Sequence, residues 1–213
     1  MPDFALETAA RSRGVAGPIV GVDEVGRGPW AGPVFACAAC LFERPAPDAF
    51  LNALADSKLL SKRKREALAP DIARYALVAL GEASVEEVDR LNVLQASMLA
   101  MARAAATLTA SLEQAPGLFL VDGNRAPKLG HAVETVVKGD GISASIAAAS
   151  IFAKVARDRH MATLASQHPG YGWERNAGYG VEAHKQGLQR LGVTIHHRRT
   201  FRPVAKLLTQ QDS

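Results

Sequence analysis

Apolar residues along the chain gather in short runs that alternate with polar, turn-forming segments. Runs of this length, bounded by Gly, Pro, Asp or Ser, predict buried β-strands rather than helices. Short connections between the first three favour an antiparallel meander. The predicted strands are IVGVD (19–23), PVFACAACLF (33–42), ALVALGEASV (76–85), LFLVD (118–122) and ETVVKGD (134–140).

Other segments carry apolar or small residues at helical spacing. An Ala-rich segment over 142–165, with Ser143 or Ser145 as its cap, predicts a helix that packs closely on a sheet, and Ser61 can cap another helix. An amphipathic helix of about five turns follows from the spacing of Leu91, Leu94, Met98, Met101 and Ala105.

Strands and helices alternate in the second half of the chain, and this order indicates parallel neighbouring strands. We therefore expect an α/β fold whose mixed sheet has three antiparallel strands and then two parallel ones, flanked by helices. A helical segment should follow Tyr179. No internal repeat or low-complexity linker divides the 213 residues, so we expect one domain with a flexible N-terminal tail over residues 1–16.

Three of the predicted strands end in an aspartate beside a glycine or glycine-rich turn: Asp23, Asp122 and Asp140. A single strand-terminal Asp usually belongs to a turn, but three of them, with Glu24 beside Asp23, favour a site. Four converging carboxylates repel one another unless a cation compensates them. An all-oxygen set of ligands suits Mg²⁺ or Mn²⁺, and two such ions can promote phosphodiester hydrolysis.

The turn Gly26-Arg27-Gly28 follows these acids directly. It lacks the spacing of a phosphate-binding P-loop, so it is either a simple tight turn or a backbone surface that approaches a sugar or phosphate. Basic residues gather in SKRKR (61–65) and HHRRTFR (196–202), and the net charge is +4. Either cluster fits a phosphate backbone or a solvated surface equally well.

Cys37 and Cys40 form a C-x-x-C inside a predicted strand, where a redox pair is not expected. Without a second cysteine pair we expect buried free thiols rather than a zinc site. His184 and the pair His196–His197 could indicate zinc, but without a partner cluster we expect them on a polar surface. The start of the chain lacks an apolar signal segment, and the apolar runs along the chain are too short to span a membrane. We therefore expect a cytoplasmic protein that does not bind a membrane.

Taken in order, the motifs make the chain recognisable: it resembles bacterial ribonuclease HII, the type 2 ribonuclease H family. The resemblance extends from about residue 18 to the end. It rests on VDEVGRGPWAGPV (22–34), DSK (56–58), VDGNR (121–125), KGD (138–140), SIAAASIFAKVARD (145–158) and HHRRTF (196–201).

The resemblance implies a ribonuclease-H-like fold and hydrolysis of the RNA strand in RNA–DNA hybrids, with cleavage 5′ of ribonucleotides embedded in duplex DNA. It implies two-metal catalysis with Mn²⁺ or Mg²⁺, leaving 3′-OH and 5′-phosphate ends, in a protein we expect to be monomeric. Catalytic and metal-binding roles fall to the four acids, Asp23, Glu24, Asp122 and Asp140. Substrate-binding roles fall to Gly26, Arg27 and Gly28 at the ribose 2′-OH, to Lys58, and to Tyr179 at the RNA–DNA junction.

By the same resemblance, residues 17–178 form the catalytic domain and residues 179–213 a helical substrate-binding segment of it. Leu59 stands where the family often has a second Lys, and Trp30 is bulkier than usual. Two alternatives remain: another polynucleotidyl transferase on this fold, or a nucleic-acid-binding protein without catalysis. For Lys154 and Arg157, on one helix face, phosphate contact and solvation are equally open.

Overall fold

The computed structural model describes residues 1–41, 46–54 and 60–211. They form two compact units, each assembled from three segments of the chain. The sheet unit comprises Met1–Val25, Phe35–Glu82 and Met98–Val155. The helical unit comprises Gly26–Val34, Ala83–Ser97 and Ala156–Ser213.

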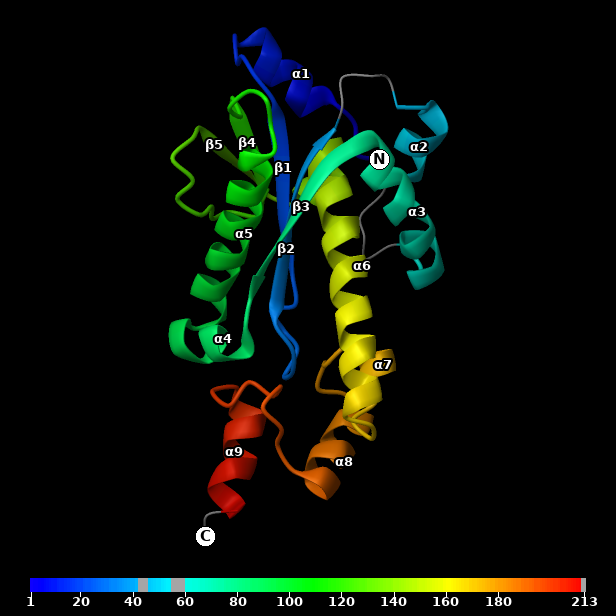
Figure 1. Cartoon of the computed structure of the whole chain (residues 1–213), viewed down its shortest axis with the longest axis vertical. Coiled ribbons are helices and arrows are strands. Elements are labelled where there is room, and N and C mark those ends of the chain that lie inside the picture. The colour runs from blue at the N-terminus through cyan, green and yellow to red at the C-terminus, as the bar shows by residue number, and fades with distance from the viewer. Residues whose placement is uncertain (42–45, 55–59, 212–213) are drawn as a thin grey trace. The chain divides into compact units, whose positions relative to one another are not determined.

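A five-stranded mixed sheet forms the centre of the sheet unit, in the order β3-β2-β1-β4-β5 (Figure 1). Strand β1 pairs antiparallel with β2 and parallel with β4, and β4 pairs parallel with β5. This arrangement confirms the mixed sheet expected from the sequence. The strands are β1 (Ile19–Val25), β2 (Val34–Leu41), β3 (Ala76–Ala83), β4 (Leu118–Asp122) and β5 (Val133–Val136).

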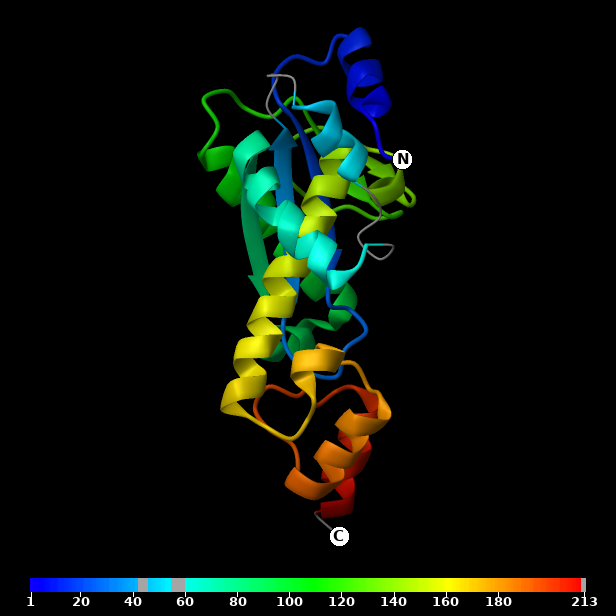
Figure 2. The ribbon, with the colours of Figure 1, turned by 90° about the vertical axis from the view of Figure 1, so that its right-hand side faces the viewer.

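Helices cover both faces of this sheet. Helix α5 lies on one face, and α3 with the first part of α6 lies on the other (Figures 1 and 2). The helices are α1 (Ala5–Ser12), α2 (Asp48–Ala53), α3 (Lys62–Tyr75), α4 (Val85–Leu91), α5 (Val93–Ala110), α6 (Ala144–Gln167), α7 (Trp173–Asn176), α8 (Glu182–Leu191) and α9 (Arg202–Gln211), with a 3₁₀ turn η1 (Gly139–Gly141).

The polar starts of two helices were predicted from the sequence. The Ser61 hydroxyl accepts the Lys64 N–H at 3.3 Å, and the Ser143 hydroxyl accepts the Ile146 N–H at 3.2 Å. Small residues then bring α6 against the sheet: a Cβ at Gly21 of β1 would lie 2.2 Å from a backbone atom of Ser145. The Ala-rich composition of α6 therefore serves close packing, as expected.

Three segments differ from the expectation. Residues 5–12, assigned to a flexible tail, form α1, because the Glu7 carboxylate accepts hydrogen bonds from Ser143 Oγ and the Ser145 N–H. The helix expected from Leu91 onward is interrupted at Asn92, whose positive φ of 67° separates α4 from α5. The run 134–140 is a strand only as far as Val136.

Among the described residues, α5 is the one helix that is long and apolar enough to cross a membrane. The core helix of a soluble protein meets the same criterion. In the sheet unit, a Cβ at Gly81 of β3 would lie 2.1 Å from the Ala100 carbonyl oxygen of α5. This close backbone approach indicates a helix packed on the sheet.

Candidate active site

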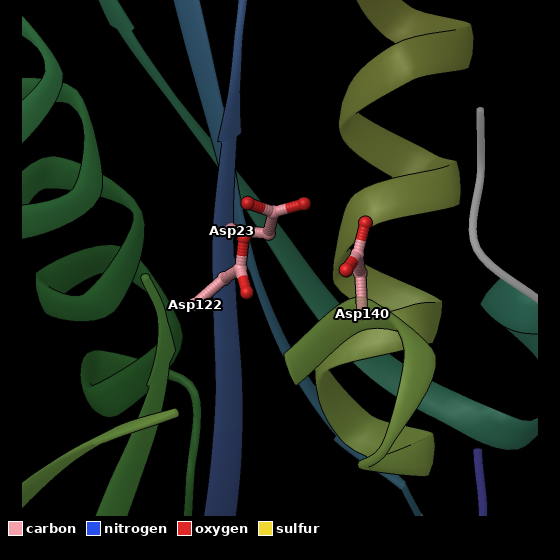
Figure 3. A group of neighbouring side chains, drawn as sticks. All are labelled: Asp23, Asp122 and Asp140. Atoms are coloured by element: carbon pink, nitrogen blue, oxygen red, sulfur yellow. The ribbon is translucent and has the colours of Figure 1, made fainter. Parts of the chain in front are cut away.

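Three of the predicted acids meet at one edge of the sheet. Asp23 extends from β1, Asp122 ends β4, and Asp140 lies in η1. One carboxylate oxygen from each lies within 4.8 Å of the others, and Figure 3 shows the three side chains gathered in front of β1 and α6. Among the described residues this is the one group of three or more acidic, His or Cys side chains close enough to share a metal ion.

The sheet and one short turn explain this convergence. Val22 of β1 pairs with Val121 of β4, so the next residue on each parallel strand, Asp23 and Asp122, reaches the same edge. Asp122 Oδ1 then accepts the N–H of Gly139 at 2.6 Å, which holds the turn that carries Asp140. The expectation that Asp140 ends a strand is corrected, because Lys138 adopts a left-handed conformation and starts η1.

The electrostatics of the cluster centre on Asp23, which is 5% exposed. Burial raises its pKa well above the usual value, and the charges of Glu24 and Asp122 raise it further. Hydrogen bonds from the Ser150 side chain and the Glu24 N–H act in the opposite direction. The site therefore concentrates negative charge that the protein itself compensates only in part.

Glu24 is the fourth predicted acid, and it lies outside the group of three. Strand β1 stays in register with β2 through Val25, so the backbone at Glu24 continues as a regular strand. The carboxylate is half-buried and close enough for its charge to raise the Asp23 pKa. Glu24 thus contributes to the electrostatic potential at Asp23, but it is not one of the residues whose carboxylate oxygens lie within 4.8 Å of one another.

In the helical unit, the loop that contains Gly26, Arg27 and Gly28 is held by a fully buried arginine. Arg198 donates from Nη2 to the Gly26 carbonyl at 2.6 Å and from Nη1 to the Arg27 carbonyl at 3.0 Å. Its Nε donates to Gly32 at 2.9 Å. In a trans peptide the N–H points opposite the C=O, so the Arg27 and Gly28 N–H groups point away from Arg198.

A second buried arginine, Arg157 of α6, holds the other end of the same loop. It donates to the carbonyls of Ala31 and Pro33 at 3.1 Å each and to Ala177 at 3.0 Å. Both sequence-based alternatives for Arg157, solvation and phosphate contact, are therefore wrong. Burial lowers the pKa of Arg157 to about 10 and that of Arg198 to about 9. Both guanidinium groups remain charged at neutral pH.

Tyr179 is 43% exposed and stands beside this turn. A Cβ added at Gly28 would lie 3.3 Å from Tyr179 Cε1, so glycine leaves the space that the ring borders. The structure thus brings the turn and Tyr179 together within the helical unit. Lys58 and Leu59, also singled out by the resemblance, lie outside the described residues.

The histidines expected on a polar surface are the clearest correction. His184 and His197 are fully buried, with their Nε2 atoms 3.1 Å apart, and Trp173 Nε1 donates to His184 Nε2 at 3.1 Å. His184 and His197 are 13 positions apart, so no local pattern in the sequence indicated that their rings are in contact. By contrast, Cys37 and Cys40 are buried free thiols, as expected.

Comparison with known proteins identifies a matching family and structures of similar fold. The family model described as Ribonuclease HII matches residues 20–204. A Ribonuclease HII of Cereibacter sphaeroides is 54% identical over 213 residues, covering 100% of this chain and 96% of the relative. The crystal structure of ribonuclease H2 from Pyrococcus horikoshii has a TM-score of 0.73 at 24% identity, covering 92% of this chain and 100% of that one. Bst-RNase HIII in complex with Mn²⁺ has a TM-score of 0.73 at 20% identity, covering 98% and 81%.

Proposed function

Because the chain belongs to the ribonuclease HII family and is thus a ribonuclease H, we propose that it hydrolyses the RNA strand of RNA–DNA hybrids. We further propose that it cuts 5′ of single ribonucleotides embedded in duplex DNA. One observation carries the hydrolytic part: Asp23, Asp122 and Asp140 place carboxylate oxygens within 4.8 Å of one another. A protein that only binds a polyanion gains nothing from such a cluster.

The donor set fits a divalent cation. Its atoms are all carboxylate oxygens, which Mg²⁺ and Mn²⁺ prefer. The pKa of Asp23 is raised first by burial and then by the charges of Glu24 and Asp122, so the ionised cluster is unfavourable in the protein alone. We assign Asp23, Glu24, Asp122 and Asp140 as ligands. Two bound ions would activate a water and stabilise the leaving oxygen. The structure of Bst-RNase HIII in complex with Mn²⁺ supports a divalent cation as the cofactor.

The chain's own residues would orient both the metal ligands and the substrate. Asp122, by accepting the Gly139 N–H, fixes Asp140 before any ion arrives. The outward N–H groups of Arg27 and Gly28 are suited to the ribose 2′-OH and the adjoining phosphate, and Tyr179 is suited to stack at the junction. We propose Gly26 and Lys58 as further substrate contacts. We also propose that the enzyme works in the cytoplasm as a monomer.

A duplex of labelled DNA with one ribonucleotide tests the function. With Mg²⁺ or Mn²⁺ we expect one nick 5′ of the ribonucleotide, leaving 3′-OH and 5′-phosphate ends, and with EDTA no nick. An all-DNA duplex of the same sequence is the control. Products ending in 2′,3′-cyclic phosphate would overturn the mechanism, because they require the 2′-OH as nucleophile. Tight binding without any cleavage would favour the non-catalytic alternative.

A further inference from the structure

The buried histidines of the helical unit form a connected hydrogen-bond chain that leads toward Tyr179. His197 contacts Thr194 on one side and His184 on the other, and His184 contacts the Tyr179 carbonyl at 3.0 Å. We propose that His184 is a positioning residue: held in one tautomer by His197 and Trp173, it donates to the Tyr179 carbonyl and fixes the turn that presents Tyr179. This inference rests on the proposed role of Tyr179 in substrate recognition.

The partners at each end determine where the protons lie. His197 Nδ1 accepts the Thr194 backbone N–H at 3.0 Å, so a neutral His197 carries its proton on Nε2. At the far end, the Tyr179 carbonyl has no proton to give, so His184 Nδ1 must be the donor. His184 Nε2 is then an acceptor, and Trp173 Nε1, which can only donate, contacts it at 3.1 Å.

The surroundings keep both rings neutral. A proton on His184 Nε2 would face the donating N–H groups of Trp173 and His197, and both rings are buried. Burial lowers the pKa of His184, and it lowers the pKa of His197 to about 3 with the help of the neighbouring His184. Because neither ring is protonated at neutral pH, the direction of the chain of donors is fixed.

The end of this chain is a strained turn. Ala177 has a positive φ of 47°, and the Tyr179 N–H is taken by the Asn176 carbonyl at 2.9 Å. The Tyr179 carbonyl accepts both the Val181 N–H and His184 Nδ1. Both backbone groups of Tyr179 are therefore held while its ring stays exposed beside Gly28. Losing the His184 donor leaves the Tyr179 carbonyl with the Val181 N–H as its one remaining partner among these two.

Two amide substitutions separate the nitrogens of His184. In His184→Asn the amide nitrogen lies near the position of Nδ1, so it can still donate to Tyr179. In His184→Gln the amide reaches the Nε2 side and meets Trp173 and His197, but the donor to Tyr179 is lost. We expect His184→Asn to keep kcat/KM on a single-ribonucleotide duplex within about two-fold, and His184→Gln to lower it about five-fold, the effect of one hydrogen bond.

A double-variant comparison shows whether the loss passes through Tyr179. Adding His184→Gln to Tyr179→Ala should cause no further loss of kcat/KM, because the side chain being positioned is already absent. A purely structural role would instead give multiplied losses and equal effects of the Asn and Gln variants. Either of those results would overturn the inference.

Nuclear magnetic resonance of ¹⁵N-labelled protein tests the same arrangement without any substrate. We expect the imidazole signals of His184 to show a proton on Nδ1 and those of His197 a proton on Nε2, both neutral at pH 7, with His197 neutral down to pH 5. Both variants lose the imidazole ring, but His184→Gln also loses the donor, so it should shift the amide signals of Gly180 and Val181 more than His184→Asn does. A proton on His184 Nε2, or equal shifts in both variants, would refute the positioning role. If wild type fails to cleave, the proposed function fails, and these spectra still decide the hydrogen-bond chain.

Discussion

Asp23 combines near-complete burial with a cluster of like charges, which is unfavourable for the protein on its own. Replacing it with Asn removes one charge with little change in shape. We expect Asp23→Asn to abolish cleavage and yet, in EDTA, to melt at the same or a higher temperature than wild type. Differential scanning fluorimetry of both proteins measures this.

Millimolar Mn²⁺ supplies the second half of that test. A ligand stabilises only the state that binds it, so the ion should raise the melting temperature of wild type more than that of Asp23→Asn. A variant strongly destabilised in EDTA would identify Asp23 as a structural residue, and the metal-centre interpretation would then lose its main support.

Tyr179 offers a prediction about recognition rather than stability. Its ring is exposed and carries little of the core, so Tyr179→Ala should fold normally. Loss of an aromatic stacked on a base costs about 1–3 kcal/mol, which corresponds to roughly 5- to 150-fold in kcat/KM on the single-ribonucleotide duplex. Cleavage at the wild-type rate would show that Tyr179 does not contact the substrate.

Because the pKa of His197 is lowered in the folded protein, we expect the free energy of unfolding to depend on pH. Its pKa is about 3 in the folded protein against 6.5 in the unfolded chain, so below about pH 6.5 the unfolded state binds more protons. Stability from this group is complete above that pH and falls as the pH drops toward 3, by at most about 1.4 kcal/mol per pH unit.

The comparison protein for this measurement is His197→Gln. The melting-temperature advantage of wild type over the variant should shrink between pH 7 and 5. Asp23, whose raised pKa acts in the opposite direction, is present in both proteins and cancels in the difference. An advantage that stays constant over this range would mean that His197 is not held neutral by burial.

At the scale of elements, the starts of strands and helices could be predicted from the sequence. The hydrogen-bond partners that lie far away along the chain could not. Apolar runs and the serine caps Ser61 and Ser143 indicate where strands and helices begin, because these signals involve residues within one turn. Arg157 and Arg198 looked like surface charges, since a sequence gives no sign that backbone carbonyls more than a hundred residues away surround them. The position of Asp140 in η1 was missed for a related reason: it depends on Asp122 holding the turn.

The loop between β1 and β2 is therefore held by two distant arginines, and Arg198 carries the end at Gly26. In Arg198→Lys the ammonium cannot reach three carbonyls, so at least one buried acceptor is left unpaired. We expect a loss of about 2–5 kcal/mol in the free energy of unfolding, measured by urea denaturation. Arg202→Lys, at an exposed position, is the matched control and should stay within about 0.5 kcal/mol. Equal effects of the two substitutions would contradict the anchoring role.

For the whole molecule, family membership follows from the full length of the chain, and the sequence motifs already indicated it. The division of the chain into two units does not follow a single boundary in the sequence. The sequence suggested a boundary near residue 179, whereas the helical unit also takes in Gly26–Val34 and Ala83–Ser97. Segments distant along the chain share one core there: Ala31 packs with Met161, Trp173 and Leu188. Periodicity within a window of the sequence contains no information about such pairings.

The separation in sequence between the loop that follows β1 and its anchor, Arg198, has a consequence for biosynthesis. Gly26 lies 172 positions before Arg198, which stands near the C-terminus. A ribosome makes the chain from its N-terminus, so the loop is translated well before Arg198 is added. A message cut short after Asp140 would yield a polypeptide whose loop lacks Arg198. The placement of Arg198 thus makes the hydrogen bonds at the Gly26 end of the loop depend on a later part of the chain.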